Sequence, residues 1–444
     1  MADVQELILA GADEHDLARL DEYRAIGGYG VLERARGMSR EAVIEEISNA
    51  ALRGRGGAGF PMGRKLSLVQ PPEVAGKPTY VVANADESEP GSFKDREIMS
   101  RVPHRFIEGC LIAAHAIGSR NVFIYIRGEY LAEYEVLKAA ADEARDAGLL
   151  GDVVLVIHRG AGAYICGEET ALLDSLEGKR GNPRLKPPFP AIQGLYDGPT
   201  LINNVETLSN APHIIASGAE WFRSFGTEQS PGTKVVSVSG DVQRPGNYEV
   251  ELGIETKRLI NGLAGGPLPG RKIKGIFPGG SSSPVLTPDE ALDRPYSWEA
   301  MADAGSMLGS GSIIVFDETT SVVELALRTA RFYHHESCGK CTPCREGTNW
   351  TVKMLERMIR GEATPIDLET VASVQDNIIG HCLCVLGDSM AMPVGSMVRK
   401  FRNEFDRALE GRDEEHDELT RIGVVQGSPQ QLGAATGGPA EVPG

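Results

Sequence analysis

The sequence has no apolar run that approaches the 18 or so residues of a membrane span, and its N-terminus has no basic segment followed by an apolar stretch, as a secretory signal would. We therefore expect a cytoplasmic chain. Basic residues are also in deficit, with 45 Lys and Arg against 62 Asp and Glu and a formal net charge of −17. This balance argues against nucleic acid or an anionic membrane surface as partner, because both attract basic proteins.

Cysteine is scarce outside one segment. Five of the seven cysteines lie between positions 338 and 384. An odd number of cysteines, mostly gathered in one place, indicates cofactor ligation and not a disulfide framework. Cys110 and Cys166 stand alone, and we expect both to be packing residues.

Glycine, in contrast, is abundant, with 53 of 444 residues. Average usage is about 7%. An excess of this size indicates tight turns and backbone that lies close to ligands. The length predicts about three domains.

Alternating strands and helices predict a parallel α/β domain over residues 1–230. Its expected strands are 79–84, 121–127 and 152–158, and its expected helices are 39–52, 103–118, 130–148 and 168–178. A small α+β module follows over 231–318, where two β-runs flank a Pro-Gly turn and further strands come later. Helical patterns at 321–337, 347–361, 365–380 and 393–411 predict a bundle over 319–410. Residues 411–444 have the composition of a disordered tail.

The glycine loop "GRGGAG" at 54–59 fits G-x-G-x-x-G, but it follows a helix and precedes Phe60-Pro61, so it is not an ordinary dinucleotide fingerprint. Arg55, Arg64 and Lys65 lie close to it. Because glycines let backbone N–H groups approach a phosphate and basic side chains balance its charge, we favour phosphate binding over a plain turn.

A second polar loop, "NADESEPGSFKDRE" at 84–97, follows the carboxyl end of a predicted strand, where open α/β sheets bind ligands. The side chains that could hold a heterocycle and its sugar are Asn84, Asp86, Glu87 and Ser88. Glu87 and Glu89 lie so close that burying both would be costly, which suggests function. A solvated acidic loop is the alternative.

Further loops carry weaker signals. In "HRGAGAYICGEETALL", Glu168 and Glu169 open a helix and could either cap it or bind ribose hydroxyls. Lys186 and Phe189 lie on a proline-stiffened loop, and "INNVETL" offers the adjacent amides of residues 203 and 204. Together these loops suggest more than one nucleotide-like ligand.

The strongest signal is "ESCGKCTPCREG", which spaces Cys338, Cys341 and Cys344 as C-x-x-C-x-x-C. This spacing lets three thiolates converge on a cubane cluster, as in ferredoxins. A zinc site is the alternative, but its usual cysteine pairs need no third cysteine at the same spacing. Cys382 and Cys384 in "HCLCVLGD" are the candidates for the fourth ligand.

These strings, with "LRGRGGAGFPMG", "PRLKPPFPA", "NNVETL" and "PGGSSSPVL", make the sequence resemble the NADH-binding flavoprotein subunit of respiratory complex I, the F subunit in bacteria, over residues 40 to about 405. The resemblance implies FMN and one [4Fe–4S] cluster as cofactors and NADH as substrate. It implies an FMN-binding α/β domain, a β-grasp module at 231–318 and a helical cluster domain.

The resemblance also implies the site residues. Those implied around FMN are Gly54, Gly56, Gly57, Gly59, Lys65, Asn84, Asp86, Glu87, Ser88, Gly167, Glu168, Asn203 and Asn204. Those implied around NADH are Phe60, Glu87, Tyr164, Glu168, Glu169, Lys186 and Phe189, with Glu87 as the catalytic carboxylate. The implied cluster ligands are Cys338, Cys341, Cys344 and Cys384, the last because it fits the register of the closing "LCVLGD". One departure is that Leu66 and Leu68 stand where the family commonly has aromatic residues, one of which helps to hold the adenine ring.

The implied function is that of the NADH-oxidising subunit of the proton-translocating NADH-quinone oxidoreductase. Electrons would pass from NADH through FMN to the cluster, and onward to quinone in partner subunits. The implied partners are the 2Fe–2S subunit and the multi-cluster subunit of the complex I peripheral arm, on the cytoplasmic side of the cell membrane. The alternative is the diaphorase subunit of an NAD-linked hydrogenase or formate dehydrogenase. A scaffold with a zinc site and a sugar- or cobalamin-binding β-grasp module is the non-enzymatic alternative.

Overall fold

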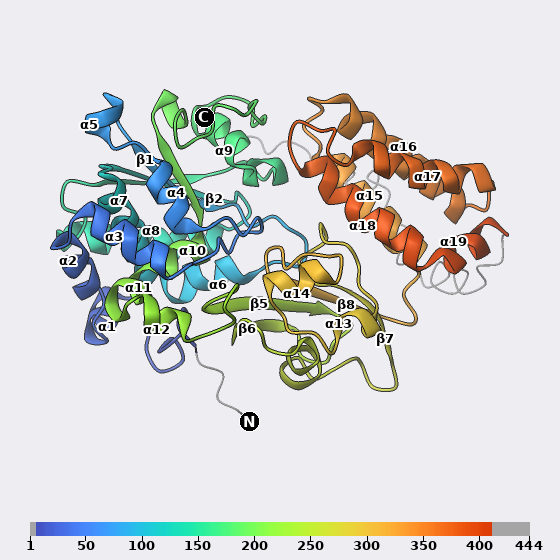
Figure 1. Cartoon of the computed structure of the whole chain (residues 1–444), viewed down its shortest axis with the longest axis horizontal. Coiled ribbons are helices and arrows are strands. Elements are labelled where there is room, and N and C mark those ends of the chain that lie inside the picture. The colour runs from blue at the N-terminus through green and yellow to red at the C-terminus, as the bar shows by residue number, and fades with distance from the viewer. Residues whose placement is uncertain (1–5, 411–444) are drawn as a thin grey trace, which may run out of the picture.

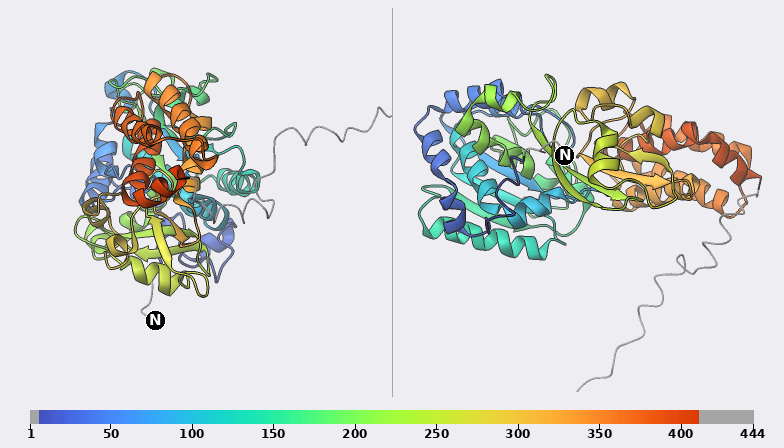
Figure 2. Two further views of the ribbon diagram at one scale, coloured as in Figure 1. Left: turned by 90° about the vertical axis from the view of Figure 1, so that its right-hand side faces the viewer. Right: turned by 90° about the horizontal axis from the view of Figure 1, so that it is seen from below.

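The computed structural model describes residues 6–410, so the predicted tail lies outside the described residues. An α/β region and a set of helices lie at opposite ends of an elongated molecule, and a second sheet lies between them (Figures 1 and 2). Among the described residues, no helix is both long enough and apolar enough to cross a membrane.

The first sheet is parallel, as predicted, and has four strands in the order β3-β2-β1-β4. They are β1 (Tyr80–Ala85), β2 (Asn121–Ile126), β3 (Val154–Arg159) and β4 (Thr200–Asn204). The sequence prediction missed β4, a short run that ends in two asparagines. The strand order reverses at β1, which has β2 on one side and β4 on the other.

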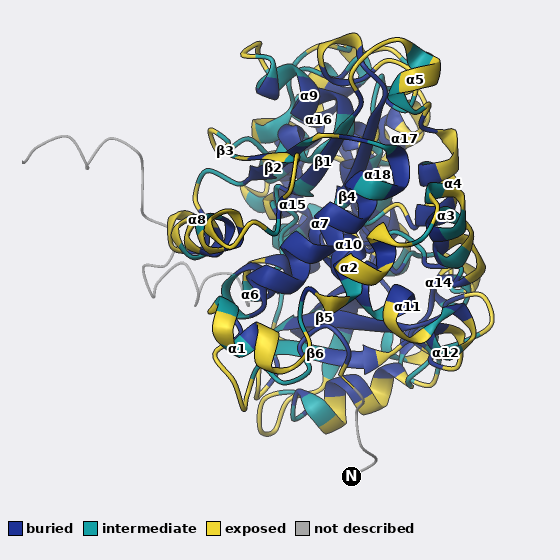
Figure 3. Ribbon diagram, turned by 90° about the vertical axis from the view of Figure 1, so that its left-hand side faces the viewer, coloured by how far each residue is buried: buried dark blue, intermediate teal, exposed yellow. Residues whose placement is uncertain are grey.

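Helices cover both faces of this sheet. Val81 and Ala83 of β1 pack into one core with the almost entirely buried α7, whereas Val82 packs into another core with α9 (Figure 3). This alternation follows from the two-residue period of a strand. The helices of the region are α1 (Leu20–Ala25), α2 (Gly30–Arg36), α3 (Arg40–Asn49), α4 (Met62–Leu68), α5 (Pro72–Ala75), α6 (Lys94–Arg101), α7 (Pro103–Ile117), α8 (Leu131–Asp146), α9 (Glu169–Leu176), α10 (Val205–Ser209), α11 (Ala211–Ser217) and α12 (Ala219–Arg223), with 3-10 turns η1 (Tyr164–Gly167) and η2 (Leu195–Asp197).

The second sheet has the order β6-β5-β8-β7, with β5 and β8 parallel and both outer pairs antiparallel. Its elements are β5 (Thr233–Gly240), β6 (Gly246–Glu251), β7 (Ile273–Phe277), β8 (Ser312–Asp317), η3 (Arg258–Leu263), α13 (Pro288–Ala291) and α14 (Trp298–Asp303). Two hairpins joined through parallel central strands are the arrangement expected of a β-grasp module. We use that name for residues 231–318.

The C-terminal region is helical, as predicted. It comprises α15 (Val322–Glu336), α16 (Thr342–Ile359), α17 (Pro365–Ile378), α18 (Leu386–Lys400) and α19 (Arg402–Leu409). Two predicted boundaries are wrong. The third cysteine, Cys344, lies inside α16. The last predicted helix is two helices, because the backbone of Phe401 is not helical and separates α18 from α19, and α18 starts before Pro393 and continues through it. Pro393 is buried, so tertiary packing outweighs the backbone hydrogen bond that an internal proline removes.

Candidate functional site

The candidate site lies at the carboxyl ends of β1 and β4, where the strand order reverses. Asn84 at the end of β1 is the register partner of Asn204 at the end of β4, and Ala83 is the partner of Asn203. Open α/β sheets bind ligands at such a switch point. The two asparagine-bearing segments, far apart in the sequence, therefore meet at the position that the fold offers for a ligand.

The glycine loop packs against this edge. A Cβ atom on Gly56 would lie 2.7 Å from the Cβ atom of Asn204, so this position requires glycine. The loop closes where the Gly54 N–H donates to the Phe60 carbonyl (3.0 Å). Its backbone therefore lies directly on the carboxyl end of β4.

Of the three basic side chains near the loop, only one lies at the site. Lys65 donates to the Ile202 carbonyl (2.9 Å) and lies 3.6 Å from the Glu169 carboxylate. Arg55 is buried and donates to the Pro231 carbonyl, and the Arg64 guanidinium lies over the Phe60 ring. One Arg55 nitrogen therefore serves the contact with the β-grasp module, while its Nε and Nη1 atoms have no partner among the described residues, so its part in balancing a bound phosphate stays a prediction.

Two buried polar atoms at the site have no partner among the described residues. They are the Asn203 amide nitrogen and the Asp86 Oδ2 atom. The other Asp86 oxygen accepts from the Ser88 hydroxyl (2.6 Å), and Asn84 donates to the Gly167 carbonyl (2.9 Å). A free donor and a free acceptor at one edge of the sheet fit FMN, whose ring and ribityl chain carry groups of both kinds. Burial raises the pKa of Asp86 to about 7.

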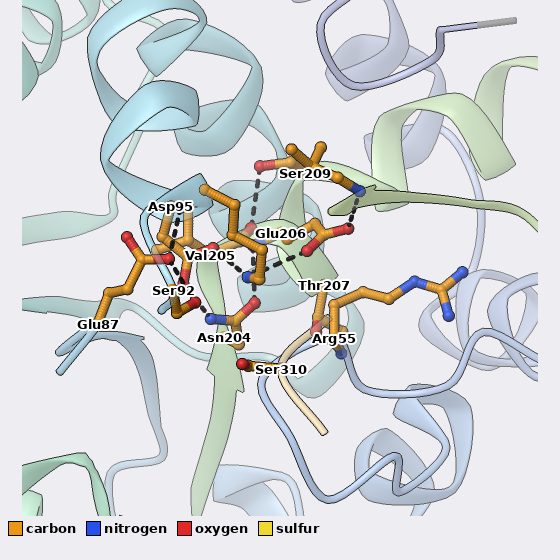
Figure 4. A network of polar contacts seen from close by, with 12 residues as sticks. Arg55, Glu87, Ser92, Asp95, Asn204, Val205, Glu206, Thr207, Ser209 and Ser310 are labelled. Atoms are coloured by element: carbon orange, nitrogen blue, oxygen red, sulfur yellow. Dashed lines mark hydrogen bonds and ion pairs between the residues drawn. The ribbon is translucent and has the colours of Figure 1, made fainter. Parts of the chain in front are cut away.

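The Asn204 side chain is held by a closed ring of contacts (Figure 4). Its amide donates to Asp95 Oδ2 (2.6 Å), and Lys94 donates to Asp95 Oδ1 (2.6 Å). Lys94 also contacts the Glu206 carboxylate (3.0 Å). The Glu206 N–H donates to Asn204 Oδ1 (3.0 Å), which closes the ring. Asn204 is therefore fixed from within the protein, while Asn203 has a donor to spare.

The Glu87 carboxylate faces the start of α6. One oxygen accepts from the Ser92 hydroxyl and the Asp95 N–H, and the other accepts from the Arg96 N–H and the Tyr130 hydroxyl, at 2.9–3.1 Å. Burial raises its pKa. The contacts that the structure gives this carboxylate are those of a helix cap, and its implied catalytic role stays a prediction.

The carboxylate that contacts the Tyr164 hydroxyl belongs to Glu89, a residue to which the sequence analysis assigned no place in the site. It accepts from the Tyr164 hydroxyl (2.8 Å) and from the Ser282 N–H of the β-grasp module (2.7 Å), and the Tyr333 hydroxyl of α15 lies 3.4 Å away. A signal for it was present, since two neighbouring glutamates are costly to bury unless both have partners. Glu89 thus joins all three regions beside a predicted site residue.

Glu168 and Glu169 combine capping with ion pairing. The Glu168 side chain accepts from the Thr170 and Ala171 N–H groups (both 2.9 Å) at the start of α9. Lys186 donates to both glutamates, at 3.0 and 3.1 Å. Glu168 is therefore a helix cap, which was one of the two alternatives, and ribose binding by this pair stays a prediction.

Three apolar side chains on the predicted nucleotide-binding loops and on α4 face solvent. Phe60, Phe189 and Leu68 are 38%, 55% and 51% exposed, whereas Leu66 is fully buried. Exposed rings are available to stack on a nucleotide base. Of the two leucines that replace aromatic residues, Leu68 is the one whose side chain is open to a ligand.

Four cysteines line one cavity in the helical region. They are Cys338, Cys341, Cys344 and Cys384. Ile165 and Pro183 of the α/β region also line this cavity. Within residues 6–410, no three His, Cys, Asp or Glu side chains are close enough to hold a single metal ion. Thiols arranged around a cavity fit a cubane cluster, which is larger than one ion.

Cys382 does not line this cavity. Its sulfur donates to the Ile378 carbonyl at the end of α17 (3.7 Å), and a Cβ on Gly387 would meet it at 2.5 Å. The neighbouring Cys382 thiol lowers the pKa of Cys344 to about 7, and burial raises that of Cys384 to about 12. Cys382 is thus a neighbour of the cavity, beside Cys344 and Cys341.

Two family descriptions match this chain. Residues 47–213 match the Nuo51 FMN-binding domain, and residues 324–408 match the NADH-ubiquinone oxidoreductase-F iron–sulfur binding region. The first range contains the switch-point site, and the second contains the cysteines of the cavity.

Similar proteins agree with these matches. The chain is 49% identical to the second F subunit of the NADH-quinone oxidoreductases of Rhizobium meliloti (strain 1021), covering 92% of this chain and 98% of that one. It is 50% identical to the NADH-quinone oxidoreductase F subunit of Mycobacterium bovis, covering 88% and 89%. Among solved structures, an air-oxidised NAD+-reducing [NiFe]-hydrogenase has a chain that matches with a TM-score of 0.81 and 36% identity, covering 91% of this chain and 67% of that one.

Proposed function

The chain belongs to the F-subunit family of NADH-quinone oxidoreductases, and from that premise we propose which residues bind its cofactors and which subunits it contacts. As a member of that family it carries an FMN-binding domain and a [4Fe–4S] region, oxidises NADH and transfers the electrons onward. The first match falls within the proposed domain 1–230 and the second within 319–410. The β-grasp module at 231–318 lies between them.

The observation that carries the FMN assignment is the unpaired donor of Asn203 together with the unpaired acceptor of Asp86 at the switch point. The backbone of Gly54, Gly56, Gly57 and Gly59 would line the phosphate end, with Lys65 as the nearby cation. Asn84, Ser88, Gly167 and Asn204 complete the cradle. Because Asn204 is fixed by its own ring of contacts, its part is to hold the glycine loop and the start of α10 in place.

For NADH we propose that Phe60 and Phe189 flank the adenine and that Glu168, Glu169 and Lys186 bind the polar groups between the two bases. Tyr164 and Glu87 would lie toward the nicotinamide, with Glu89 holding the Tyr164 hydroxyl. FMN accepts a pair of electrons as hydride and can release them singly to an iron–sulfur cluster. The protein's task is to align the nicotinamide and to exclude water from that contact.

For the cluster we propose ligation by Cys338, Cys341, Cys344 and Cys384. Their cavity reaches Ile165, the residue after Tyr164, so the cluster site and the nucleotide site share a wall. Short separation is what transfer of electrons between the two requires.

The proposed partners are the subunit with a 2Fe–2S cluster and the subunit with several clusters, in a peripheral arm on the cytoplasmic side of the membrane. Val385, the neighbour of Cys384, is 68% exposed, and Trp350 of α16 is 54% exposed. Large exposed apolar side chains near the cluster cavity support docking of an electron-accepting protein there. The hydrogenase alternative shares the fold, but the identity to that structure is lower than to the quinone-linked relatives.

A visible absorption spectrum of the purified full-length chain tests the cofactor assignment. We expect flavin bands on a broad iron–sulfur absorption, and we expect NADH to bleach both. A colourless protein would exclude the proposal and leave only the non-enzymatic scaffold. Isolation of the intact complex, with identification of its members, decides between quinone-linked and hydrogenase-linked partners.

A further inference from the structure

The fully buried carboxylate of Glu206, at the start of α10, is held by the β-grasp module. Lys234 of β5 donates its ammonium to Glu206 Oε2 (2.5 Å), and the Val235 N–H donates to Oε1 (2.9 Å). Both Lys234 and Glu206 are fully buried. The β-grasp module therefore reaches through its central strand to a residue two positions after Asn204.

Glu206 is also a member of the ring that fixes Asn204 (Figure 4). Its carboxylate contacts the Lys94 ammonium, and Lys94 donates to Asp95. Asp95 accepts a hydrogen bond from the Asn204 amide. Asn204 in turn lies against the backbone of Gly56. An unbroken series of contacts thus runs from Lys234 to the glycine loop.

The charges along this series balance. Lys94 and Lys234 offset Asp95 and Glu206, and all four side chains are at most 3% exposed. Removing one member of a buried ion pair leaves its partner uncompensated, whereas removing both does not. Burial lowers the pKa of Lys234 to about 7, against the opposing effect of Glu206, so the ammonium is charged in mildly acidic solution.

A second contact joins the same module to the same loop. A Cβ atom on Gly59 would lie 3.1 Å from the Trp298 ring of α14. The Arg53 guanidinium lies 4.9 Å from the centre of the same ring. The β-grasp module therefore touches the glycine loop directly at Gly59 and indirectly, through Glu206 and Asn204, at Gly56.

We propose that Lys234 is a positioning residue for the FMN site: the β-grasp module, through Lys234 and Glu206, sets the position of Asn204 and the glycine loop. This deepens the proposed function and rests on its assignment of FMN to the switch point. It gives the module a part in retaining the flavin, although no residue of the module lies on the strand ends that form the cradle.

The test is a double-mutant cycle on the full-length chain at pH 6.5, with the FMN dissociation constant read from flavin fluorescence. We expect Lys234→Met to weaken FMN binding by about tenfold. Glu206→Gln, which keeps the backbone N–H to Asn204, should weaken it less. The double variant should recover to within about threefold of the wild type, because Lys94 and Asp95 then balance each other.

Lys274→Met is the matched control. Lys274 lies on β7 of the same module and contacts Glu404 of α19 (3.0 Å), so it also bridges two regions but takes no part in the contacts that run from Lys234 to the glycine loop. We expect its FMN affinity to equal that of the wild type.

Three outcomes would overturn the proposal: unchanged FMN affinity in Lys234→Met, a double variant no better than that single variant, or an equal loss in Lys274→Met. If Lys234→Met does not fold, Glu206→Gln and the double variant still give the comparison. A wild-type chain that binds no FMN would instead refute the proposed function itself.

Discussion

Cys382 and Cys384 lie two positions apart, yet their sulfurs face different surroundings. Cys384 lines the cavity of the other three cysteines, and Cys382 donates to the Ile378 carbonyl outside it. A [4Fe–4S] cluster held by cysteines needs four thiolates. The position of Cys384 is therefore the one from which a fourth thiolate reaches the cavity.

We expect Cys384→Ser to lose the paramagnetic signal of the reduced cluster while FMN still accepts electrons from NADH. Quinone reduction by the assembled enzyme should then collapse, because electrons stop at the flavin. Cys382→Ser is the control and should keep both cluster and activity. The reverse pattern in electron paramagnetic resonance spectra would show that the ligand assignment is wrong.

Glu87→Gln should keep FMN bound but change the apparent affinity for NADH or the leakage of electrons to peroxide. The reason is that a glutamine has one oxygen and an NH2 group that cannot accept, so the start of α6 and the neighbouring loop lose part of their cap, at a cost of about 1–3 kcal/mol in stability. Steady-state kinetics, a peroxide assay and a melting curve measure these effects. A lower melting temperature with unchanged NADH kinetics and unchanged peroxide leakage would show that Glu87 serves only as a helix cap.

Glu89→Gln should raise the KM for NADH at unchanged FMN content. A glutamine has one acceptor, so it cannot serve both the Tyr164 hydroxyl and the Ser282 N–H. Tyr164→Phe, which removes the hydroxyl and keeps the ring, should reproduce part of the effect. Normal KM values in both variants would place the nicotinamide away from Tyr164.

Leu68→Phe should tighten NADH binding by about 0.5–1.5 kcal/mol, roughly two- to tenfold, because an exposed ring at this position can stack on the adenine. Leu66→Phe is the control. Leu66 is fully buried, so a larger side chain there should cost about 1–3 kcal/mol in stability without tightening NADH. A titration in which Leu68→Phe binds NADH no better than the wild type would contradict the placement.

FMN binding should weaken as the pH falls from about 8 to about 6, on either side of the Asp86 pKa. Burial raises the pKa of Asp86 to about 7, with Glu129 and Glu336 acting in the same direction and Arg127 in the opposite one. A ligand hydroxyl that donates to the carboxylate is bound best above this pKa and loses its acceptor as the group protonates. Asp86→Asn should bind FMN more weakly at the higher pH and lose this part of the pH dependence. An identical pH profile in wild type and variant would exclude Asp86 as the acceptor.

Local patterns in the sequence predicted much of the fold. The cap at Ser39, the end of α7 at Gly118 and the apolar runs of β1, β2 and β3 are all present as expected. Such features depend on neighbours within one turn or one strand. β4 was missed because its run is short and polar at its end.

The sequence displays the residues of the candidate site but not the contacts between them. The glycine loop and the two asparagines carry chemistry that a sequence displays, whereas the ring through Lys94, Asp95 and Glu206 joins positions more than 100 residues apart. Only the parallel pairing of β1 with β4 brings them together, and no local pattern encodes that pairing. For the same reason nothing in the sequence indicated that Arg55 donates to the Pro231 carbonyl, 176 residues further along.

Tyr164 is packed against Phe332 and Tyr333, and its N–H donates to Glu336, two residues before Cys338. During synthesis the N-terminal half of the chain leaves the ribosome first, but the η1 turn acquires these neighbours only after residue 336 has emerged. The η1 turn therefore reaches its final packing late, together with the segment that carries the first three cysteines of the cavity. A truncated chain that ends before α15 would have the glycine loop and both asparagines, yet it would lack the packing that holds Tyr164.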